Sequence, residues 1–319
     1  MNLFQKKELF SIVIPVYNSS SSLIELEERI RTTFENILEN KFDYEIIFVD
    51  DYSSNENTWK TLITLAKSKN TIKAVRLTKN FGQQSSTLCG MKQAKGDYII
   101  TMDDDLQHCP EDIPKLIDNK NHDIVLGYLK KKKHNAVRNL FSRIKDWFYY
   151  KLINKPKHVK MSSFRLLNRL IVDGILSFKT PYPFIPALMF AISQDIANVE
   201  VNHCERKTGK SGYSFYKMLK LFSNLLINNS SYLLRITGFA GINISILSFG
   251  LVIFFILKKL IFNIPVAGWT SVIVSVLFIG GLILFSTGVI GEYLIRIIHS
   301  QEQPESYFIR EIAGKKDYT

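Results

Sequence analysis

The stretch DYIITMDDDLQH, residues 97–108, decides the fold because it joins an apolar strand pattern to three consecutive aspartates. The apolar part, YII, has the composition of a buried strand. Asp103, Asp104 and Asp105 follow it almost directly. Carboxylates this close repel one another, and burying them without a counter-ion is costly. The sequence therefore predicts that something positively charged binds at the end of this strand.

Four more strand patterns surround this stretch in the first 130 residues. They are FSIVIPVY from residue 10, YEIIFVD from 44, IKAVRL from 72 and DIVLG from 123. Helical patterns lie between them, and two of these open on capping-box patterns, Ser22-x-x-Glu25 and Ser53-x-x-Glu56. Alternating strands and helices predict an α/β fold with a mostly parallel sheet. Ligands bind such sheets at the carboxyl ends of the strands, where Asp50–Asp51 and the triple aspartate fall.

An Asp-x-Asp pair after a strand offers hard oxygen ligands to Mg²⁺ or Mn²⁺. Such an ion keeps waters and bridges protein carboxylates to a substrate diphosphate. Asp-x-Asp alone is a weak signal, but the following Gln107 and the second acidic strand end at Asp50–Asp51 strengthen it. A zinc site at His108 and Cys109 is disfavoured because two adjacent residues lack the spacing of a structural set. His108 is interpreted as a polar turn residue.

Charge and cysteine content narrow the class of protein. The formal net charge of +12 over 319 residues fits nucleic acid, an anionic membrane face or a phosphorylated substrate. Three cysteines without paired spacing argue against a disulfide framework and for a reducing compartment. The N-terminus has no apolar run followed by a cleavage site, so no secretory signal is expected.

Two long uncharged runs, residues 236–257 and 266–291, predict membrane spans. Each exceeds the roughly 20 residues that cross a bilayer as a helix. Neither shows the polar face of a soluble helix, so a transmembrane hairpin over about 236–257 and 267–290 is favoured over two core helices. Flanking Lys and Arg outnumber the two lysines of the connecting loop, which predicts that both termini are cytoplasmic.

Two basic amphipathic helices are expected, over about 136–153 and over 213–234. Helices of this kind next to membrane spans commonly lie in the headgroup layer. For residues 136–153, packing on the preceding domain is an equally good interpretation. For residues 213–234, which run into the first span, the membrane interface is favoured.

The segments SIVIPVYN, IIFVDDYSSNENT, NFGQQSSTLCGMKQAKGDYIITMDDDLQHCPEDIPKL and SSFRLLNR resemble family 2 glycosyltransferases with the GT-A fold. Within that family they are similar to the subgroup of dolichyl-phosphate mannose synthase and bacterial undecaprenyl-phosphate glycosyltransferases. ERKTGKSGYSFYKMLKL, the hairpin and GEYLIRIIHSQEQPESYFIRE resemble the bacterial branch, so nearly the whole chain is covered.

The resemblance implies four parts. They are a cytoplasmic, Rossmann-like GT-A catalytic domain over 1–212, a juxtamembrane helix over 213–234, two spans within 235–295 and a cytoplasmic tail over 296–319. It also implies a metal-dependent hexosyltransferase of the inner membrane that uses Mg²⁺ or Mn²⁺. The expected reaction is inverting transfer from a nucleotide-sugar, expected to be a UDP-sugar, to a polyprenyl phosphate, expected to be undecaprenyl phosphate. The lipid-phosphate-sugar product would serve modification of cell-envelope glycans.

The resemblance also assigns site residues. The catalytic metal–diphosphate pair is Asp103 and Asp105, with Gln107 as a further metal ligand. The nucleotide-sugar site follows three strand ends: Pro15, Tyr17, Asp50, Asp51, Asp103 and Asp104. The groups for the acceptor or diphosphate phosphates are Arg138, Arg165, Arg206, Lys210, Ser211 and Tyr213. The chain departs from the subgroup at Ser162–Ser163, where an acidic residue often stands, and at Gly212, where Lys is common and Lys210 is the expected substitute.

A phosphate monoester has a second pKa of about 6, so the acceptor is already nucleophilic at neutral pH and needs no dedicated general base. The alternatives are a processive or hydroxyl-acceptor membrane glycosyltransferase and a non-enzymatic basic membrane-binding protein. The chain lacks the QxxRW motif that processive glycosyltransferases carry, and a non-enzymatic membrane-binding protein would leave the acidic strand ends unexplained. No nucleic-acid partner is expected, and a homo-oligomer stays open.

Overall fold

The computed structural model describes residues 7–129, 153, 155–202, 204, 268–302 and 305–314, with isolated positions between 237 and 261. The predicted basic helix over 136–153 lies outside the described residues except for Ile153. The predicted helix over 213–234 lies outside them entirely, and the first predicted span is described only at isolated positions. The chain divides into two compact units, Met1–Gly212 with Gln303–Thr319, and Tyr213–Glu302.

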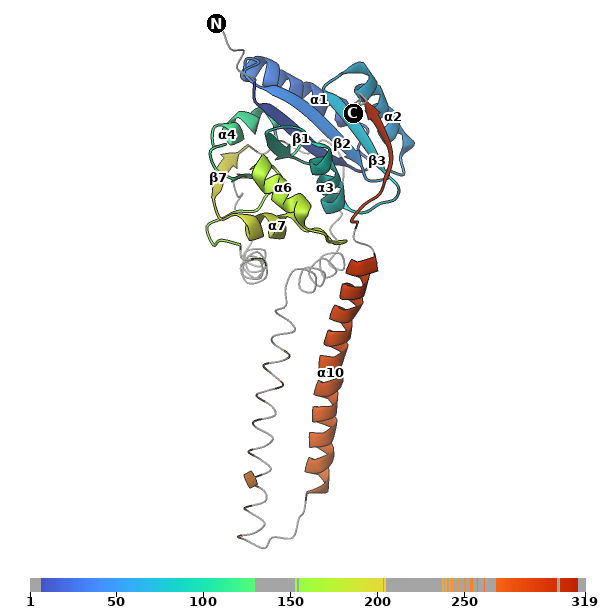
Figure 1. The fold of residues 1–319 in the computed structure, drawn as a ribbon, viewed down its shortest axis with the longest axis vertical. Coiled ribbons are helices and arrows are strands. Elements are labelled where there is room, and N and C mark those ends of the chain that lie inside the picture. The colour runs from blue at the N-terminus through green and yellow to red at the C-terminus, as the bar shows by residue number, and fades with distance from the viewer. Residues whose placement is uncertain are drawn as a thin grey trace. The chain divides into compact units, whose positions relative to one another are not determined.

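The first unit is built on one eight-stranded sheet in the order β7-β5-β6-β4-β1-β2-β3-β8 (Figure 1). Strands β1, β2, β3 and β4 are parallel to one another, and β5 is parallel to β7. Strand β6 is antiparallel to β4 and β5, and β8 is antiparallel to β3. The strands are β1 (Leu9–Val16), β2 (Asp43–Asp50), β3 (Ile72–Leu77), β4 (Tyr98–Thr101), β5 (Ile124–Leu129), β6 (Arg165–Asn168), β7 (Ile196–Val201) and β8 (Ile309–Gly314). All five predicted strands and the mostly parallel α/β fold are confirmed.

Helices cover both faces of this sheet because successive strand residues point to opposite sides. Ile12 and Ile14 belong to the apolar cluster formed with α1 and α2. Val13, on the other face, lies against α3, where any side chain at Gly90 would collide with it. The helical elements are α1 (Leu23–Thr32), η1 (Thr33–Ile37), α2 (Glu56–Ser68), α3 (Gln83–Gln93), η2 (Pro110–Asp112), α4 (Ile113–Ile117), α6 (Arg169–Ser177), α7 (Ile185–Ile192) and α10 (Trp269–Glu302).

The two predicted capping boxes are wrong, and both serine hydroxyls serve the strand ends instead. The Ser22 hydroxyl makes no cap bond and donates to the backbone oxygen of Asp104 at 2.7 Å. Helix α2 begins at Glu56 with Asn55 as its N-cap, while the Ser53 hydroxyl accepts from the backbone N–H of Asn18 at 2.9 Å. In both places the serine hydroxyl makes a longer-range hydrogen bond instead of the capping bond that the local motif predicts.

The C-terminal segment, expected to be a tail, contributes strand β8 to the eight-stranded sheet. In Figure 1 this red strand lies beside β3, and Ala74 pairs with Ala313 in the register. Thr78 N–H donates to the Phe308 carbonyl oxygen at 2.9 Å. Tyr307 is only 7% exposed. The chain therefore leaves the first unit after residue 212 and rejoins its sheet after residue 302.

Deleting residues 305–319 is expected to lower the melting temperature of the protein by on the order of 10 °C. The deletion removes the β3–β8 ladder and the buried Tyr307 ring, and it leaves β3 as an unpaired edge. Differential scanning fluorimetry in detergent measures the change. Deletion of 315–319, which begins beyond β8, is the matched control and is expected to change the melting temperature little; an equal loss in both variants would contradict a structural role for β8.

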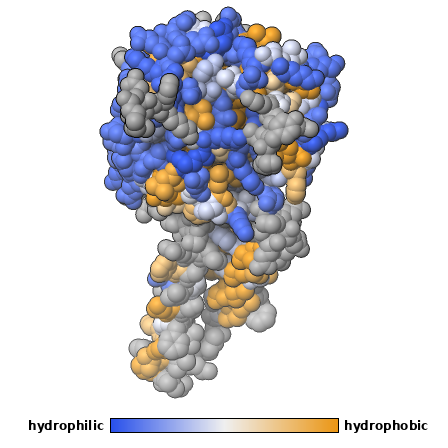
Figure 2. All heavy atoms as spheres, turned by 45° about the horizontal axis from the view of Figure 1, so that its top comes forward, coloured by the Kyte–Doolittle hydropathy of each residue, from blue (hydrophilic) through white to orange (hydrophobic). Residues whose placement is uncertain are grey.

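Helix α10 is long and apolar. Within the described residues, its window Phe278–Ile295 has the length and hydropathy needed to cross a membrane. At 1.5 Å per residue, its 34 residues extend about 51 Å. The helix ends at Glu302, beyond the predicted second span, which ends at about residue 290. Phe278, Ile283 and Leu284 are exposed along it. Figure 2 shows hydrophobic residues in orange at the surface, among the grey ones. An exposed apolar surface of this kind is typical of a membrane or protein interaction site.

Candidate active site

The carboxyl ends of β4, β1 and β2 lie side by side and bring the acidic residues together. In the parallel register Val13 pairs with Thr101 and Val16 pairs with Asp50. The residues that follow the three strands therefore share one edge of the sheet. The Tyr17 backbone N–H donates to Asp104 Oδ2 at 3.2 Å, which joins the β1 end to the acidic loop, residues 102–109.

The Asp103 carboxylate is held by a donor on each oxygen. Gln83 Nε2, in the first turn of α3, donates to Asp103 Oδ1 at 2.6 Å. The Ser163 hydroxyl donates to Asp103 Oδ2 at 2.6 Å. Because each carboxylate oxygen has a second lone pair, the group can still accept a cation. Gln83 and Ser163 were not among the predicted site residues, although both stand in segments that carried the family resemblance.

Asp104 and Asp105 differ in environment. Burial, together with the charges of Asp103 and Asp105, raises the pKa of Asp104 to about 6, although hydrogen bonds from Ser19 and Tyr17 act in the opposite direction. Asp105 Oδ1 accepts from the Gln107 backbone N–H at 3.1 Å. Leu106 between them is buried and has φ of 62°. This left-handed residue lets the loop bury Leu106 while Asp105 and Gln107 stay partly exposed.

Asp50 and Asp51 lie inside the protein rather than at its surface. Asp50 is fully buried, and its Oδ2 lies 3.2 Å from Nε of Arg76. Asp51 accepts from the backbone N–H groups of Phe81 at 2.8 Å and Gly82 at 2.9 Å. Burial raises the pKa of both carboxyl groups. Asp51 thus anchors the turn that starts α3, where Gly82 has φ of 90°.

Two exposed tyrosines stand beside this acidic edge. Tyr17 follows β1 and is 50% exposed, and Tyr52 follows Asp51 and is 40% exposed. The guanidinium groups of Arg76 and Arg310 lie 5.6 and 6.0 Å from the Tyr52 ring centroid. Tyr17 is a predicted nucleotide-site residue. Tyr52, which was not among the predicted residues, directly follows the Asp50–Asp51 pair.

The predicted phosphate residue Arg165 is 3% exposed, within β6. Its Nε donates to Thr101 Oγ1 at 3.0 Å, and the Thr101 hydroxyl donates to the Ser163 carbonyl oxygen at 2.6 Å. Burial lowers the pKa of Arg165 to about 10, while the Asp103 charge acts in the opposite direction. The guanidinium therefore lies behind Asp103 and does not reach solvent. Arg138, Arg206, Lys210, Ser211 and Tyr213 lie outside the described residues.

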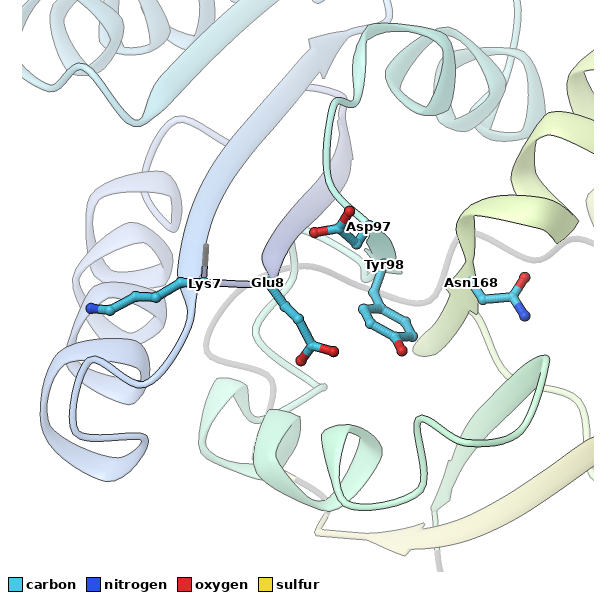
Figure 3. Close-up of a pocket in the computed structure, with 5 residues that line it drawn as sticks. All are labelled: Lys7, Glu8, Asp97, Tyr98 and Asn168. Carbon is cyan, nitrogen blue, oxygen red and sulfur yellow. The ribbon is translucent and has the colours of Figure 1, made fainter. Parts of the chain in front are cut away.

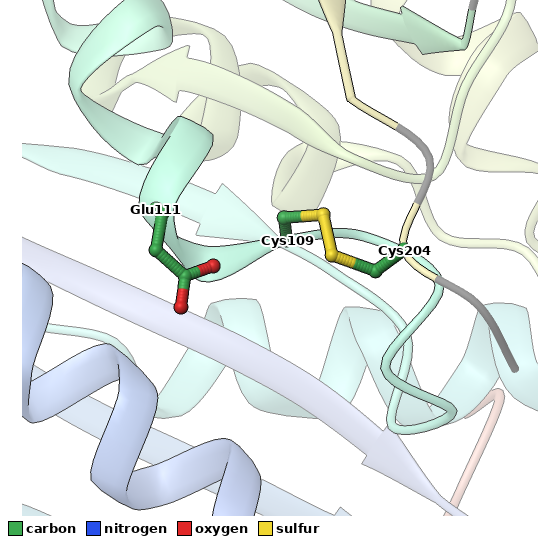
Figure 4. Close-up of side chains that lie close together, drawn as sticks. All are labelled: Cys109, Glu111 and Cys204. Carbon is green, nitrogen blue, oxygen red and sulfur yellow. A yellow bond between two sulfur atoms is a disulfide. The ribbon is translucent and has the colours of Figure 1, made fainter. Parts of the chain in front are cut away.

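The sequence argued against a disulfide framework, but one disulfide is present in the structure. Cys109 and Cys204, 95 residues apart, form a disulfide (Figure 4). Cys109 ends the acidic loop and Cys204 follows β7, so only the fold brings them together. Cys89 is a buried free thiol whose pKa burial raises to about 12. His108, interpreted from the sequence as a polar turn residue, is buried and stacked on Phe164 with a centroid distance of 5.3 Å.

A separate surface cavity of about 390 Å³ lies at the opposite end of the strands. It is lined by Lys7, Glu8, Asp97, Tyr98 and Asn168 (Figure 3). Tyr98 is the first residue of β4, whereas Asp103 follows its last residue. The cavity is therefore distinct from the acidic edge.

Comparisons with known proteins agree with this geometry. The model of the glycosyl transferase family 2 matches residues 11–176. An undecaprenyl-phosphate 4-deoxy-4-formamido-L-arabinose transferase of Proteus mirabilis is 33% identical, over 99% of this chain and 97% of its own. The Pseudomonas aeruginosa enzyme of the same name is 30% identical, over 96% of this chain and 90% of its own. Glucosyl-3-phosphoglycerate synthase of Mycobacterium tuberculosis, solved with Mn²⁺, UDP and glucosyl-3-phosphoglycerate, shares the fold with a TM-score of 0.50 at 14% identity, covering 70% of this chain and 80% of that chain.

Proposed function

Because the chain belongs to glycosyl transferase family 2, we propose that it transfers a sugar from a UDP-sugar to undecaprenyl phosphate at the membrane surface. The observation that carries this proposal is the extent of the identity with undecaprenyl-phosphate transferases. It covers 99% of the chain, and so includes the C-terminal apolar region as well as the catalytic sheet. An enzyme whose acceptor is a lipid phosphate needs the sheet to carry the active site and the apolar region to hold that site at the membrane.

A divalent cation fits the acidic edge. Asp103, Asp105 and Gln107 offer two carboxylates and an amide oxygen, the hard ligands that Mg²⁺ and Mn²⁺ prefer. The raised pKa of Asp104 reflects, after burial, the charges of two neighbouring carboxylates, which a cation would offset. When bound, the ion neutralises the departing nucleoside diphosphate as a Lewis acid. A divalent metal is supported by the Mn²⁺ in the glucosyl-3-phosphoglycerate synthase structure, and the choice between Mg²⁺ and Mn²⁺ belongs to this proposal.

The chain's own residues align the acceptor phosphate with the anomeric carbon of the donor sugar. The acceptor phosphate is nucleophilic at neutral pH, so the site must hold it in line with the anomeric carbon rather than deprotonate it. In-line attack inverts the anomeric centre. Exposed Tyr17 offers a ring face for the donor base at the β1 end. Arg165, buried behind Asp103, supports that carboxylate through Thr101 and Ser163 and is proposed to act on the donor diphosphate only through it.

Strand β8 also bears on membrane topology. Because residues after 302 pair with β3, the segment 213–302 leaves and rejoins the same folded unit. A segment that returns to its starting side crosses the membrane an even number of times, which supports the two-span hairpin. The excess of Lys and Arg outside the hairpin loop supports a cytoplasmic location for that side and for both termini.

Gln83→Ala is expected to weaken Mn²⁺ binding and to lower kcat/KM for transfer by about 10-fold each. The change frees Asp103 Oδ1 to rotate away from the geometry that the short Gln83 bond imposes. Calorimetric Mn²⁺ titration and initial rates measure the two effects. Gln93→Ala, at the far end of the same helix, is the control. Equal behaviour of the two variants would show that Gln83 does not position Asp103.

The function is tested by incubating the purified protein with undecaprenyl phosphate and a panel of radiolabelled UDP-, GDP- and dTDP-sugars, followed by lipid extraction. We expect label in the lipid phase with one sugar, only when Mg²⁺ or Mn²⁺ is present, and with inverted anomeric configuration. Label that appears only in free sugar, or transfer at full rate in excess chelator, would contradict the proposal.

A further inference from the structure

The disulfide between Cys109 and Cys204 ties the acidic loop to the segment after β7. The two Cα atoms lie 5.8 Å apart, within the range that a disulfide bridges without backbone movement. Cys109 is two residues beyond Gln107, a proposed metal ligand. The bond thus covalently restrains the loop that carries the metal site.

Hydrogen bonds align the two cysteines independently of the sulfur–sulfur bond. Asp112 accepts from the backbone N–H of Asn202 at 2.6 Å and from its side-chain amide at 3.0 Å. Cys204 N–H donates to the Gln107 carbonyl oxygen at 3.2 Å. The thiols of the reduced protein would therefore stay close together, and the disulfide could re-form readily.

The pair is open to solvent on one side. Cys109 is 5% exposed, whereas Cys204 is partly exposed. The Arg29 guanidinium lies 3.3 Å from Cys204 Sγ, where its charge stabilises negative charge on that sulfur during exchange. Cys109, Cys204 and Glu111 also place three ligand atoms within 4.8 Å of one another. A metal centre does not fit there, because the sulfurs are bonded to each other and Glu111 is held by Arg29 at 2.7 and 2.8 Å.

We propose that the Cys109–Cys204 pair is a redox-sensitive clamp, closed by oxidation and opened by thiols, that holds Gln107 in place for metal binding. In the cytoplasm, disulfides are typically transient and redox-sensing rather than structural. The Mn²⁺ part of this inference and its cytoplasmic setting rest on the proposed function, whereas the disulfide itself and its redox titration do not.

Closure consumes one low-molecular-weight disulfide, RSSR. The Cys204 thiolate attacks RSSR, forms a mixed disulfide and expels one RS⁻. The Cys109 thiolate then attacks the Cys204 sulfur and expels the second RS⁻. The two protons lost by the protein thiols convert the two RS⁻ to RSH, so the protein is oxidised and RSSR is reduced by two electrons. Opening is the reverse reaction with two RSH.

The first test is a redox titration of the full-length protein in detergent. The protein is equilibrated at graded ratios of reduced to oxidised glutathione and quenched with acid. It is then denatured in the presence of N-ethylmaleimide, which alkylates free thiols, and the labelled cysteines are identified by mass spectrometry. We expect Cys109 and Cys204 to become labelled together in one transition, with Cys89 labelled throughout as the internal standard. Full labelling of Cys109 and Cys204 at the most oxidising ratio, or labelling with two separate midpoints, would overturn the clamp.

The second test compares oxidised and reduced protein. We expect the oxidised form to melt roughly 10 °C higher and to bind Mn²⁺ about 10-fold more tightly. Cys109→Ser and Cys204→Ser should each abolish both differences, while Cys89→Ala, the matched control, should keep them. Equal Mn²⁺ affinity in the two forms of the natural protein would overturn the coupling to the metal site. A protein that binds no Mn²⁺ in either form would overturn the proposed metal site, while the titration still decides whether the clamp exists.

Discussion

Asp105→Asn is expected to lower sugar transfer to undecaprenyl phosphate by on the order of 10³-fold. Asp105 is partly exposed at the end of β4, where the proposed cation meets the donor diphosphate. Replacing its carboxylate by an amide removes a charged ligand, so negative charge on the departing diphosphate is no longer balanced. The fold should persist, because an Asn side-chain oxygen can still accept the Gln107 N–H that Asp105 Oδ1 accepts now.

The measurement is the initial rate of lipid labelling, together with the melting temperature and the Mn²⁺ dissociation constant. Asp118→Asn is the matched control, since Asp118 is exposed and lies after α4, outside the acidic loop. We expect the control to behave as the natural protein in all three measurements. Near-normal transfer by Asp105→Asn would remove Asp105 from the metal site, and a lowered melting temperature without altered Mn²⁺ binding would make its role structural.

Excising residues 213–302 is expected to reduce use of long-chain acceptor by on the order of 100-fold while leaving donor hydrolysis nearly unchanged. A flexible Gly/Ser linker of about 20 residues would join residue 212 to residue 303, so that β8 can still pair with β3. The reason is local concentration. Without the apolar segment the enzyme no longer resides where undecaprenyl phosphate is held, but its sheet and acidic edge are retained.

The comparison variant is a truncation that removes everything from Arg235 onward. That truncation also removes β8, so we expect it to lose thermal stability and both activities. Rates with undecaprenyl phosphate in vesicles, and of UDP-sugar hydrolysis in solution, separate the two effects. If the excised protein melts normally but loses hydrolysis as fully as transfer, residues 213–302 take part in the donor site and do more than hold the enzyme at the membrane.

Much of the fold could be predicted because its signals are local. Alternating apolar strands and amphipathic helices identified β1 to β5 and the parallel sheet, and a parallel sheet already places Asp50–Asp51 and Asp103–Asp105 on one edge. The acidic edge was therefore visible from order along the chain. Its internal arrangement was not, because the donors on Asp103 come from α3 and from the segment before β6.

The two capping-box predictions failed because a distant partner binds each serine hydroxyl. The Ser22 hydroxyl bonds to Asp104 rather than capping its own helix. The roles of Arg165 and Asp50 at the site stay predictions, and the structure adds where the two side chains lie. Arg165 is buried in β6 between β4 and β5, and Asp50 is buried beside Arg76 of β3.

By itself the sequence determined the family, the order of the strands along the chain, the acidic strand ends and the apolar C-terminal runs, because each follows from neighbours within a few residues. The tertiary structure alone decided that Cys109 meets Cys204, that β8 closes the sheet beside β3, and that Gln83 and Ser163 orient Asp103. These contacts join residues 20 to more than 200 positions apart. Their formation depends on burial and pairing summed over the whole sheet, which no local pattern encodes.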